Sequence, residues 1–186
     1  MVSLFRYCVV LCAALLSACA GVAPQATRDM PAFELAGRIV VRHQDRGFSS
    51  SLRWKQAAGS DDIWLTAPLG QTIAHLEADA SGATLTGADQ RQYRAGSIES
   101  LTRSAFGWPF PVAGLRYWVL GQPAAAMTLA GAERDDAGRL TRFRQDDWQV
   151  RLNYASAAGT LPSRLEVVGS DAEIRFVIDS RAPAHP

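Results

Sequence analysis

The sequence predicts a mainly β fold, a curved and incomplete antiparallel β-barrel of about eleven strands with two or three short helices capping an apolar cavity. Short segments alternate apolar and polar residues with a period of two. Turns rich in Gly and Asp recur every 8–12 residues or so without intervening helices, which favours antiparallel pairing. A single pair of helical segments interrupts the strands midway. An antiparallel sheet of this length curls towards a barrel, and helices inserted midway would cover its concave side.

The chain begins with a segment typical of a secretory signal peptide, assigned to residues 1–18. Arg6 precedes an apolar run over residues 9–16, which is shorter than the about 20 residues needed to span a bilayer. The run ends in Leu16-Ser17-Ala18-Cys19, which resembles the bacterial lipobox. That resemblance implies cleavage before Cys19, diacylglycerol on its thiol and an acyl chain such as palmitate on the new amino group. The alternative is an ordinary signal peptide that happens to end in cysteine.

The residues after the cleavage site predict a lipid-anchored protein on a tether. Ala20 and Gly21 follow Cys19, and the lack of aspartate there implies sorting to the outer membrane of a Gram-negative bacterium. Residues 19–32 contain glycine and proline with little periodicity, so we interpret them as an acylated cysteine and a flexible tether. Thr27 offers an alternative start for a third short helix.

The predicted mature chain carries no net charge. Removal of residues 1–18 from the 186-residue chain leaves 168 residues, the size of one domain. Of the 19 basic residues only Arg6 is lost, and none of the 18 acidic residues is lost, so 18 of each remain. This balance argues against nucleic-acid binding, which needs a basic face, and against strong attraction to anionic lipid. Cys19 is the only cysteine left, so stability must come from a packed core rather than from disulfides.

Residues 33–180 are assigned to one domain and residues 181–186 to a C-terminal tail. The period of two is clear in the first predicted strand, where Phe33, Leu35, Ile39 and Val41 share one face. The remaining strands are predicted at 48–55, 62–67, 71–77, 83–86, 92–95, 127–133, 139–145, 148–154, 164–168 and 173–179. The two central helices are predicted after Ser97, ending at Gly107, and after Pro111, ending at Gly121.

The turn between residues 67 and 71 carries an apolar residue where turns are normally polar. Pro68 and Gly70 mark a reversal of the chain, and they place Leu69 at its tip. Leu69 either folds back onto the core or stays exposed as an apolar finger that touches a membrane or a lipid. Composition alone favours the first interpretation.

The sequence contains no recognisable catalytic or metal-binding motif, so we expect no enzyme activity, metal or cofactor. His43, His75 and His185 have no metal-ligand partners at the usual spacing. Nucleophile elbows, phosphate-binding glycine loops and zinc-protease motifs are missing. Three acid pairs fall at predicted turns, where they are expected to shape the turn and remain solvated: Asp61/Asp62, Asp135/Asp136 and Asp146/Asp147.

The order of several short motifs resembles the LolB family of outer-membrane lipoprotein receptors over nearly the whole chain. After the lipobox, these motifs are Gly37-Arg38, Leu52-Arg53-Trp54, residues 67–72, residues 110–112 and 115–121, Gln145, residues 148–150 and Leu161-Pro162. Each motif alone is weak, and their order and spacing together are specific. The resemblance implies a half-barrel with helices closing an apolar cavity. It also implies that Leu69, with Pro68 and Gly70, forms an exposed membrane-insertion loop.

The same resemblance implies a function. A LolB-like protein accepts lipoproteins from the periplasmic carrier LolA and inserts them into the inner leaflet of the outer membrane, without nucleotide hydrolysis. It would act as a monomer facing the periplasm. The apolar faces of the predicted strands and second helix suggest the following residues, each of which either lines the cavity or fills a solid barrel core: Ile39, Leu52, Trp54, Trp118, Val150 and Leu152. For the set as a whole, half-barrel geometry with covering helices favours a cavity.

Two other functions remain open from the sequence. The chain would be a structural outer-membrane lipoprotein if Leu69 and residues 108–110 formed an apolar patch that scaffolds protein partners. It would be a lipid-modifying hydrolase if Ser49–Ser51 or His75 stood close to an acid at the mouth of a cavity.

Overall fold

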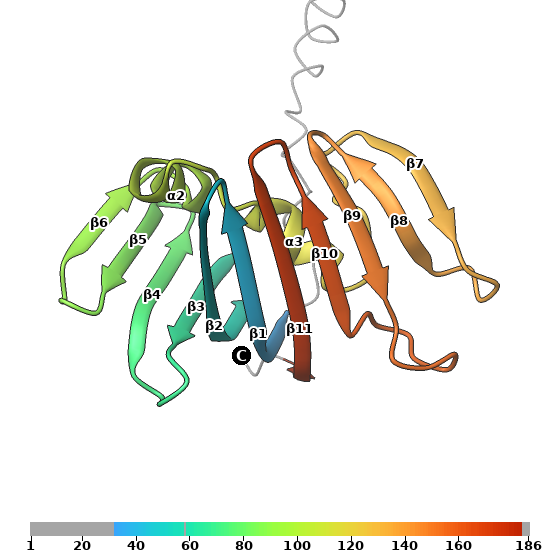
Figure 1. Cartoon of the computed structure of the whole chain (residues 1–186), viewed down its shortest axis with the longest axis horizontal. Coiled ribbons are helices and arrows are strands. Elements are labelled where there is room, and N and C mark those ends of the chain that lie inside the picture. Colours follow the sequence, from blue (N-terminus) through green and yellow to red (C-terminus); the bar gives the residue numbers. More distant parts are fainter. Residues whose placement is uncertain (1–31, 58, 184–186) are drawn as a thin grey trace, which may run out of the picture.

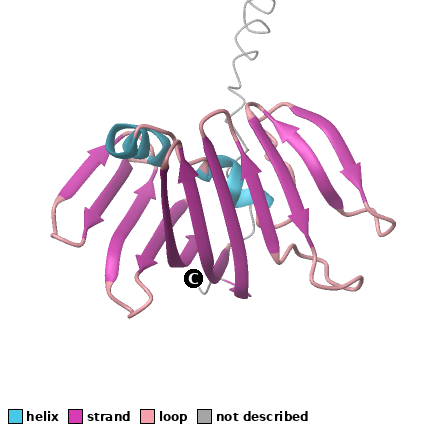
Figure 2. Ribbon diagram, in the orientation of Figure 1, coloured by secondary structure: helices cyan, strands magenta, loops and turns pink. Residues whose placement is uncertain are grey.

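A computed structural model describes residues 32–57 and 59–183. In this part of the chain, eleven antiparallel strands form one sheet in the order β6-β5-β4-β3-β2-β1-β11-β10-β9-β8-β7 (Figures 1 and 2). β6 and β7 are the two edges, and the sheet stays open between them. The predicted curved, incomplete barrel is therefore confirmed. The signal peptide, Cys19 and the tether up to Pro31 lie outside the described residues.

The sheet consists of two meanders that meet at β1 and β11. The first meander contains β1 (Phe33–His43), β2 (Arg46–Ala57), β3 (Ser60–Thr66), β4 (Thr72–Asp79), β5 (Gly82–Gly87) and β6 (Gln92–Ala95). The helices α2 (Ile98–Phe106) and α3 (Val112–Trp118) follow, and the second meander contains β7 (Leu129–Arg134), β8 (Leu140–Gln145), β9 (Trp148–Asn153), β10 (Arg164–Val168) and β11 (Ala172–Pro183). The predicted strands correspond to these elements with shifts of a few residues at their ends.

The two helices are limited by the residues that the sequence indicated. Ser97 caps α2 by accepting a hydrogen bond from the backbone N–H of Ser100 (3.1 Å), and Gly107 ends it in the left-handed conformation. α3 begins directly after Pro111. In α3, a Cβ on Gly114 would lie 2.3 Å from the ring of Trp118, so glycine leaves the space that this indole occupies.

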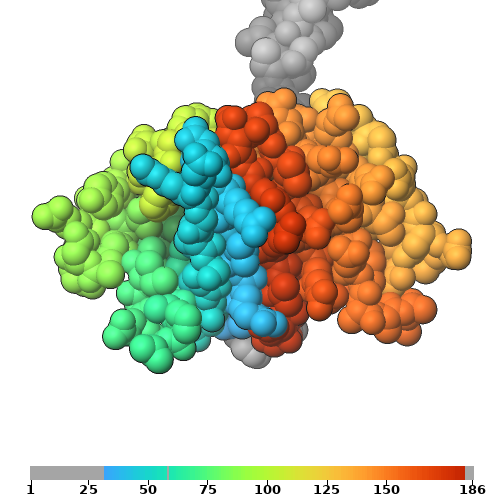
Figure 3. Space-filling view, in the orientation of Figure 1, coloured from blue at the N-terminus to red at the C-terminus, as the bar shows by residue number. Residues whose placement is uncertain are grey.

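The first and last strands of the chain lie side by side in the middle of the sheet (Figure 3). Their pairing shifts between Ala36 and Gly37 because a bulge in β11 inserts Asp179. At Gly37 the two backbones approach so closely that a Cβ would lie 2.2 Å from the carbonyl oxygen of Val177. Only glycine fits there without a backbone shift.

β11 extends beyond the predicted domain boundary. Residues 181–183 were expected to begin the tail, but they pair with residues 33–35 of β1. Arg181 explains the extension, because its guanidinium donates to the carbonyl oxygens of Val119 (2.8 Å) and Pro162. Burial lowers the pKa of Arg181 from its usual value.

Candidate functional site

The loop at residues 67–71 presents the most exposed large apolar side chain in the described part of the chain. Leu69 is 89 % exposed, and the loop extends beyond the neighbouring strands in Figure 1. Gly70 donates its N–H to the carbonyl of Ala67 and Ala67 donates to Gln71, both at 2.8 Å. This closed turn points Leu69 away from the core. The interpretation in which Leu69 folds back onto the core is therefore wrong.

An apolar crevice lies between the first meander and the segment that ends α2. Its volume is about 40 Å³, which is room for about one water molecule. The crevice is lined by Ile39, Phe48, Leu52, Ile63, Leu65, Leu76, Thr102, Phe106, Trp108 and Phe110. Thr102 adds no free polar group, because its hydroxyl donates to the carbonyl of Ile98 (2.9 Å) and accepts from the N–H of Phe110 (2.8 Å).

A larger groove adjoins this crevice. It has a volume of about 610 Å³ and is mainly apolar. It runs between α2 and strands β4–β6, and is lined by Ile73, Ala74, Leu85, Gly87, Asp89, Tyr93, Arg94, Ala95, Leu101, Ser104, Ala105 and Phe106. Phe106 lines both spaces and is 52 % exposed. The crevice and the groove are therefore neighbours with one aromatic ring between them.

Two of the six predicted cavity residues line the crevice, namely Ile39 and Leu52. The other four, Trp54, Trp118, Val150 and Leu152, lie outside both apolar spaces and are buried in the core. The period-two pattern identified the buried face of each strand but did not indicate where that face borders empty space. Phe106 was missed because it ends a helix, where a period of two carries no information.

Two buried polar side chains hold two of the core tryptophans, Trp118 and Trp54. Gln145 accepts hydrogen bonds from Trp118 Nε1 (2.7 Å) and from the N–H of Ala124 (2.8 Å), and it donates to the carbonyl of Ala124 (2.7 Å). Asp61 accepts from Trp54 Nε1 (2.9 Å) and forms an ion pair with Arg116 of α3. The expectation that Asp61 is a solvated turn residue is wrong, because β3 already begins at Ser60 and turns this carboxylate inwards.

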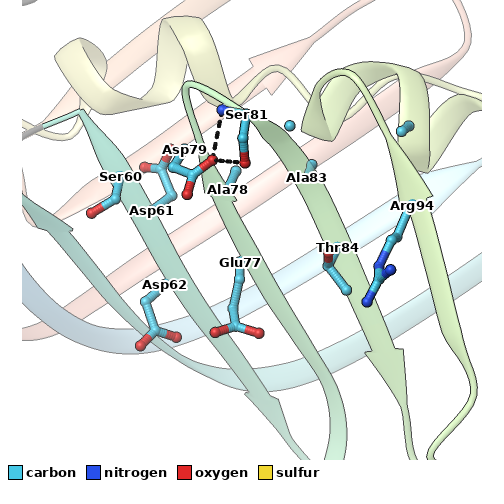
Figure 4. A pocket seen from close by; sticks show the side chains of 12 residues that line it. Ser60, Asp61, Asp62, Glu77, Ala78, Asp79, Ser81, Ala83, Thr84 and Arg94 are labelled. Atoms are coloured by element: carbon cyan, nitrogen blue, oxygen red, sulfur yellow. Dashed lines mark hydrogen bonds between the residues drawn. The ribbon is translucent and has the colours of Figure 1, made fainter.

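A polar hollow lies at the other end of the β3–β4 hairpin (Figure 4). Asp62, Glu77 and Asp79 line it with Ser81. The backbone N–H and hydroxyl of Ser81 donate to Asp79 (2.7 and 2.5 Å) and hold the pKa of Asp79 below its usual value. Within the described residues, no group of three or more His, Cys, Asp or Glu side chains is arranged to hold a metal ion.

His75 lies close to an acid, as the hydrolase interpretation requires. Its Nε2 is 2.7 Å from Asp62 Oδ1, and its ring stacks on Trp64 with the centroids 3.6 Å apart. The His75–Asp62 pair does not line the apolar crevice, and in the described part of the chain none of Ser49–Ser51 is hydrogen-bonded to His75. A serine nucleophile with an adjacent base is therefore not assembled among these residues.

Comparison with known proteins identifies the family. Residues 31–180 match the family model described as "Outer membrane lipoprotein LolB". The chain belongs to the LolB family. It is similar to the outer-membrane lipoprotein LolB of Thiobacillus denitrificans, with 39 % identity over 171 residues that cover 89 % of this chain and 90 % of the relative. LolB of Nitrosomonas europaea is 37 % identical over 151 residues, 79 % of this chain and 71 % of the relative.

The fold also occurs outside the LolB family. The crystal structure of a DUF1329 family protein from Desulfovibrio piger has a TM-score of 0.52 with this chain, covering 86 % of this chain and 88 % of that one, with 8 % sequence identity. At this identity the likeness concerns the fold alone. None of the helices in the described part of this LolB-family chain has the length and hydropathy needed to cross a membrane.

Proposed function

We propose that this LolB-family chain accepts lipoproteins from the periplasmic carrier LolA and inserts them into the inner leaflet of the outer membrane. The observation that carries the proposal is Leu69, held exposed on a closed loop of the same hairpin that contributes Leu65 to the apolar crevice. Lipid on Cys19 anchors the protein, and the domain acts as a monomer facing the periplasm.

The energetics support a transfer that runs without nucleotide hydrolysis. The transfer of each CH₂ group of an acyl chain from water into an apolar environment is favourable by about 0.8 kcal/mol of free energy. Acyl chains therefore move from one apolar space to another and finally into the bilayer, the largest apolar space available. Leu69 contributes on the order of 1.5–3 kcal/mol on entering lipid. This gain is too small to anchor the domain and large enough to direct where a client is released.

The crevice has to widen before it holds an acyl chain, since about 40 Å³ is far too little for one. The segment at residues 106–110 is the part that moves in our proposal. It bears three aromatic lining residues, and Gly107 next to Phe106 has a positive φ of 86° that marks a change of chain direction. Movement of this segment away from β2–β4 joins the crevice to the groove beside it.

The test of the insertion loop is Leu69→Glu, with Val168→Glu as the matched control at another exposed apolar position. LolA preloaded with a labelled lipoprotein is mixed with each variant, first without and then with liposomes. We expect Leu69→Glu to take the label from LolA as the wild type does and to lose transfer to liposomes, because a charge on Leu69 opposes entry into lipid. The control should retain both steps.

Two results contradict the proposal. If Leu69→Glu fails to accept the label although it is folded, the loop belongs to client binding and not to insertion. If the wild-type chain accepts no label and binds no acyl-chain probe, the scaffolding function is favoured, and the crevice is only a packing defect of the core.

A further inference from the structure

A second hollow lies on the face of the sheet opposite the apolar crevice, at the base of the 67–71 loop. It has a volume of about 560 Å³. Thr66 and Thr72, which end β3 and begin β4 on either side of the loop, both line it. The remaining lining residues are Ala36, Gly37, Ser51, Leu52, Arg53, Trp64 and Asp179. The hollow exists because several of the residues that line it are small, including Gly37, which the close approach of β11 requires.

Four polar side chains among the described residues that line this hollow are free to bind a ligand. In the described part of the chain, the Arg53 guanidinium has no ion-pair or hydrogen-bond partner, and the hydroxyls of Ser51, Thr66 and Thr72 have no hydrogen-bond partner. Among the described residues, Asp179 is the only acid that lines the hollow, and Arg38 pairs with it through two hydrogen bonds of 3.1 and 3.3 Å. The hollow therefore offers one unpaired cation and three hydroxyl groups.

The neighbouring aromatic side chain is held in a fixed orientation. Trp64 lines the hollow, and its ring stacks on that of His75 with the centroids 3.6 Å apart. Arg53 is the cross-strand partner of Trp64. A rigid indole beside a guanidinium is the combination that prefers the membrane–water interface, because tryptophan favours the headgroup level and arginine pairs with phosphate.

The depth of the hollow matches that of lipid headgroups when Leu69 reaches the hydrocarbon. Leu69 is three residues from both Thr66 and Thr72, so at about 3.3 Å per residue the hollow begins at most about 10 Å from the tip of the loop. The polar layer on each side of a bilayer is roughly 5–8 Å thick. The hollow thus lies at the level of the phosphates when the loop tip lies at the hydrocarbon boundary.

We propose that this hollow binds the phosphodiester of a membrane phospholipid, with Arg53 as the charged donor and the hydroxyls of Ser51, Thr66 and Thr72 completing the site. The proposal rests on the proposed function, since it assumes that Leu69 enters a bilayer. It adds a polar contact that orients the loop on the membrane. A chain with balanced charges gains this contact without general attraction to anionic surfaces.

The test compares Arg53→Gln with Lys55→Gln in the chain from residue 19 onwards with Cys19→Ala, which then contains no cysteine. Lys55 lies two residues further along β2, is exposed and does not line the hollow, so both variants lose one positive charge from the same strand. Partition is measured on phosphatidylcholine vesicles, which carry phosphodiesters and no net charge. We expect Arg53→Gln to reduce partition about fivefold or more and Lys55→Gln to change it less than about twofold.

A single cysteine at position 49 or 69 carries a fluorescent label for a depth measurement. Ser49 is exposed on the same face of β2 as Ser51 and does not line the hollow, so a label there leaves the site intact. A label introduced by Ser49→Cys should be quenched by headgroup quenchers, and one introduced by Leu69→Cys by quenchers in the acyl chains. Equal effects of Arg53→Gln and Lys55→Gln, or a label at position 49 that no headgroup quencher reaches, would overturn the site. Inorganic phosphate that binds the chain and displaces it from vesicles at millimolar concentration would also overturn it, in favour of a site for free phosphate.

The two proposals fail in different ways. If the wild type does not partition into vesicles and Leu69→Glu changes nothing, the insertion loop itself is wrong. If the wild type partitions, Leu69→Glu abolishes partition and Arg53→Gln behaves as Lys55→Gln does, then only the headgroup site is wrong.

Discussion

The two halves of the sheet are both antiparallel meanders, one of six strands and one of five, but they are filled differently on the side of the helices. In the second meander, Trp118 of α3 packs edge-on against Phe143 at 6.4 Å, and both side chains are buried. In the first meander, α2 buries Ile98 and Leu101 but leaves Phe106 half exposed, with a crevice on one side and a groove on the other. Two similar strand patterns thus give a solid core in one half and apolar space in the other.

This difference shows what decides whether an apolar sheet face becomes a binding space. The alternation of apolar and polar residues along each strand places the apolar side chains on one face of the sheet. The side chains of the helix that covers this face then fill the space above them to the extent that their volume allows. α3 supplies an indole and fixes it through Gln145. α2 supplies smaller side chains over β5 and β6 and ends in a ring that separates two spaces. The first meander, which carries the exposed Leu69 loop, is also the one that borders the crevice and the groove.

The sharpest way to test the comparison is to make the same substitution in both halves. Leu152→Ala in β9 removes a fully buried side chain from the solid half and should lower the free energy of unfolding by about 3–5 kcal/mol. Leu65→Ala in β3 should lower it by about half of that or less, because Leu65 is only partly buried and already borders the crevice. Denaturant unfolding of both variants measures the difference.

Binding of a fluorescent fatty-acid probe should show the reverse order. Leu65→Ala removes part of the apolar lining of the crevice and should therefore weaken probe binding severalfold. Leu152→Ala, provided that it is folded, should bind the probe as the wild type does. If Leu152→Ala weakens probe binding while Leu65→Ala does not, the acyl space lies in the second meander. The cavity residues suggested by the sequence would then be right for Val150 and Leu152.

The same contrast explains how far the sequence could predict the structure. Strands, both helices, their caps and the exposed loop follow from local signals such as alternation, Ser97, Gly107 and Pro68. The burial of Asp61 depends on Arg116, 55 residues away in the sequence, so a local pattern could not indicate it. The position of the crevice depends on which helix covers which strands, and that is a property of the tertiary fold.

Phe106 gives the next test, because it separates the crevice from the groove. Phe106→Ala should join the two spaces and accelerate uptake of the acyl probe severalfold. The expected loss of stability is only about 1–2 kcal/mol, since the ring is already half exposed. Tyr93→Ala is the matched control, because Tyr93 is 49 % exposed and lines the groove but not the crevice. Stopped-flow fluorescence measures uptake, and equal rates in the two variants would contradict the role of Phe106 as the partition.

The smallest expected effect concerns a polar cluster in the second meander. At the β7–β8 turn, Asp135 accepts from Arg139 (Nε at 2.8 Å), and Arg139 donates to the carbonyl of Ser156 (3.0 Å) and lies 4.2 Å above the ring of Tyr154. The hydrogen bond from Arg139 lowers the pKa of Asp135 below its usual value. Because the folded pKa lies below the unfolded pKa of about 3.9, the carboxylate stabilises the fold above pH 4 or so, and this contribution is lost as the pH falls through the folded pKa.

Asp135→Asn should therefore lower the urea midpoint slightly at pH 7, and the difference from the wild type should shrink towards zero as the pH falls below about 4. Asp136→Asn removes the same charge from the next residue, which is exposed, and should leave the midpoint unchanged at both pH values. If the urea midpoint of Asp135→Asn differs from that of the wild type by the same amount at pH 3 as at pH 7, the asparagine amide disturbs the turn itself. The ion pair between Asp135 and Arg139 then contributes nothing to stability. In that case the ion pair would not stabilise the second meander, and the two halves would differ only in how their helices fill the concave side.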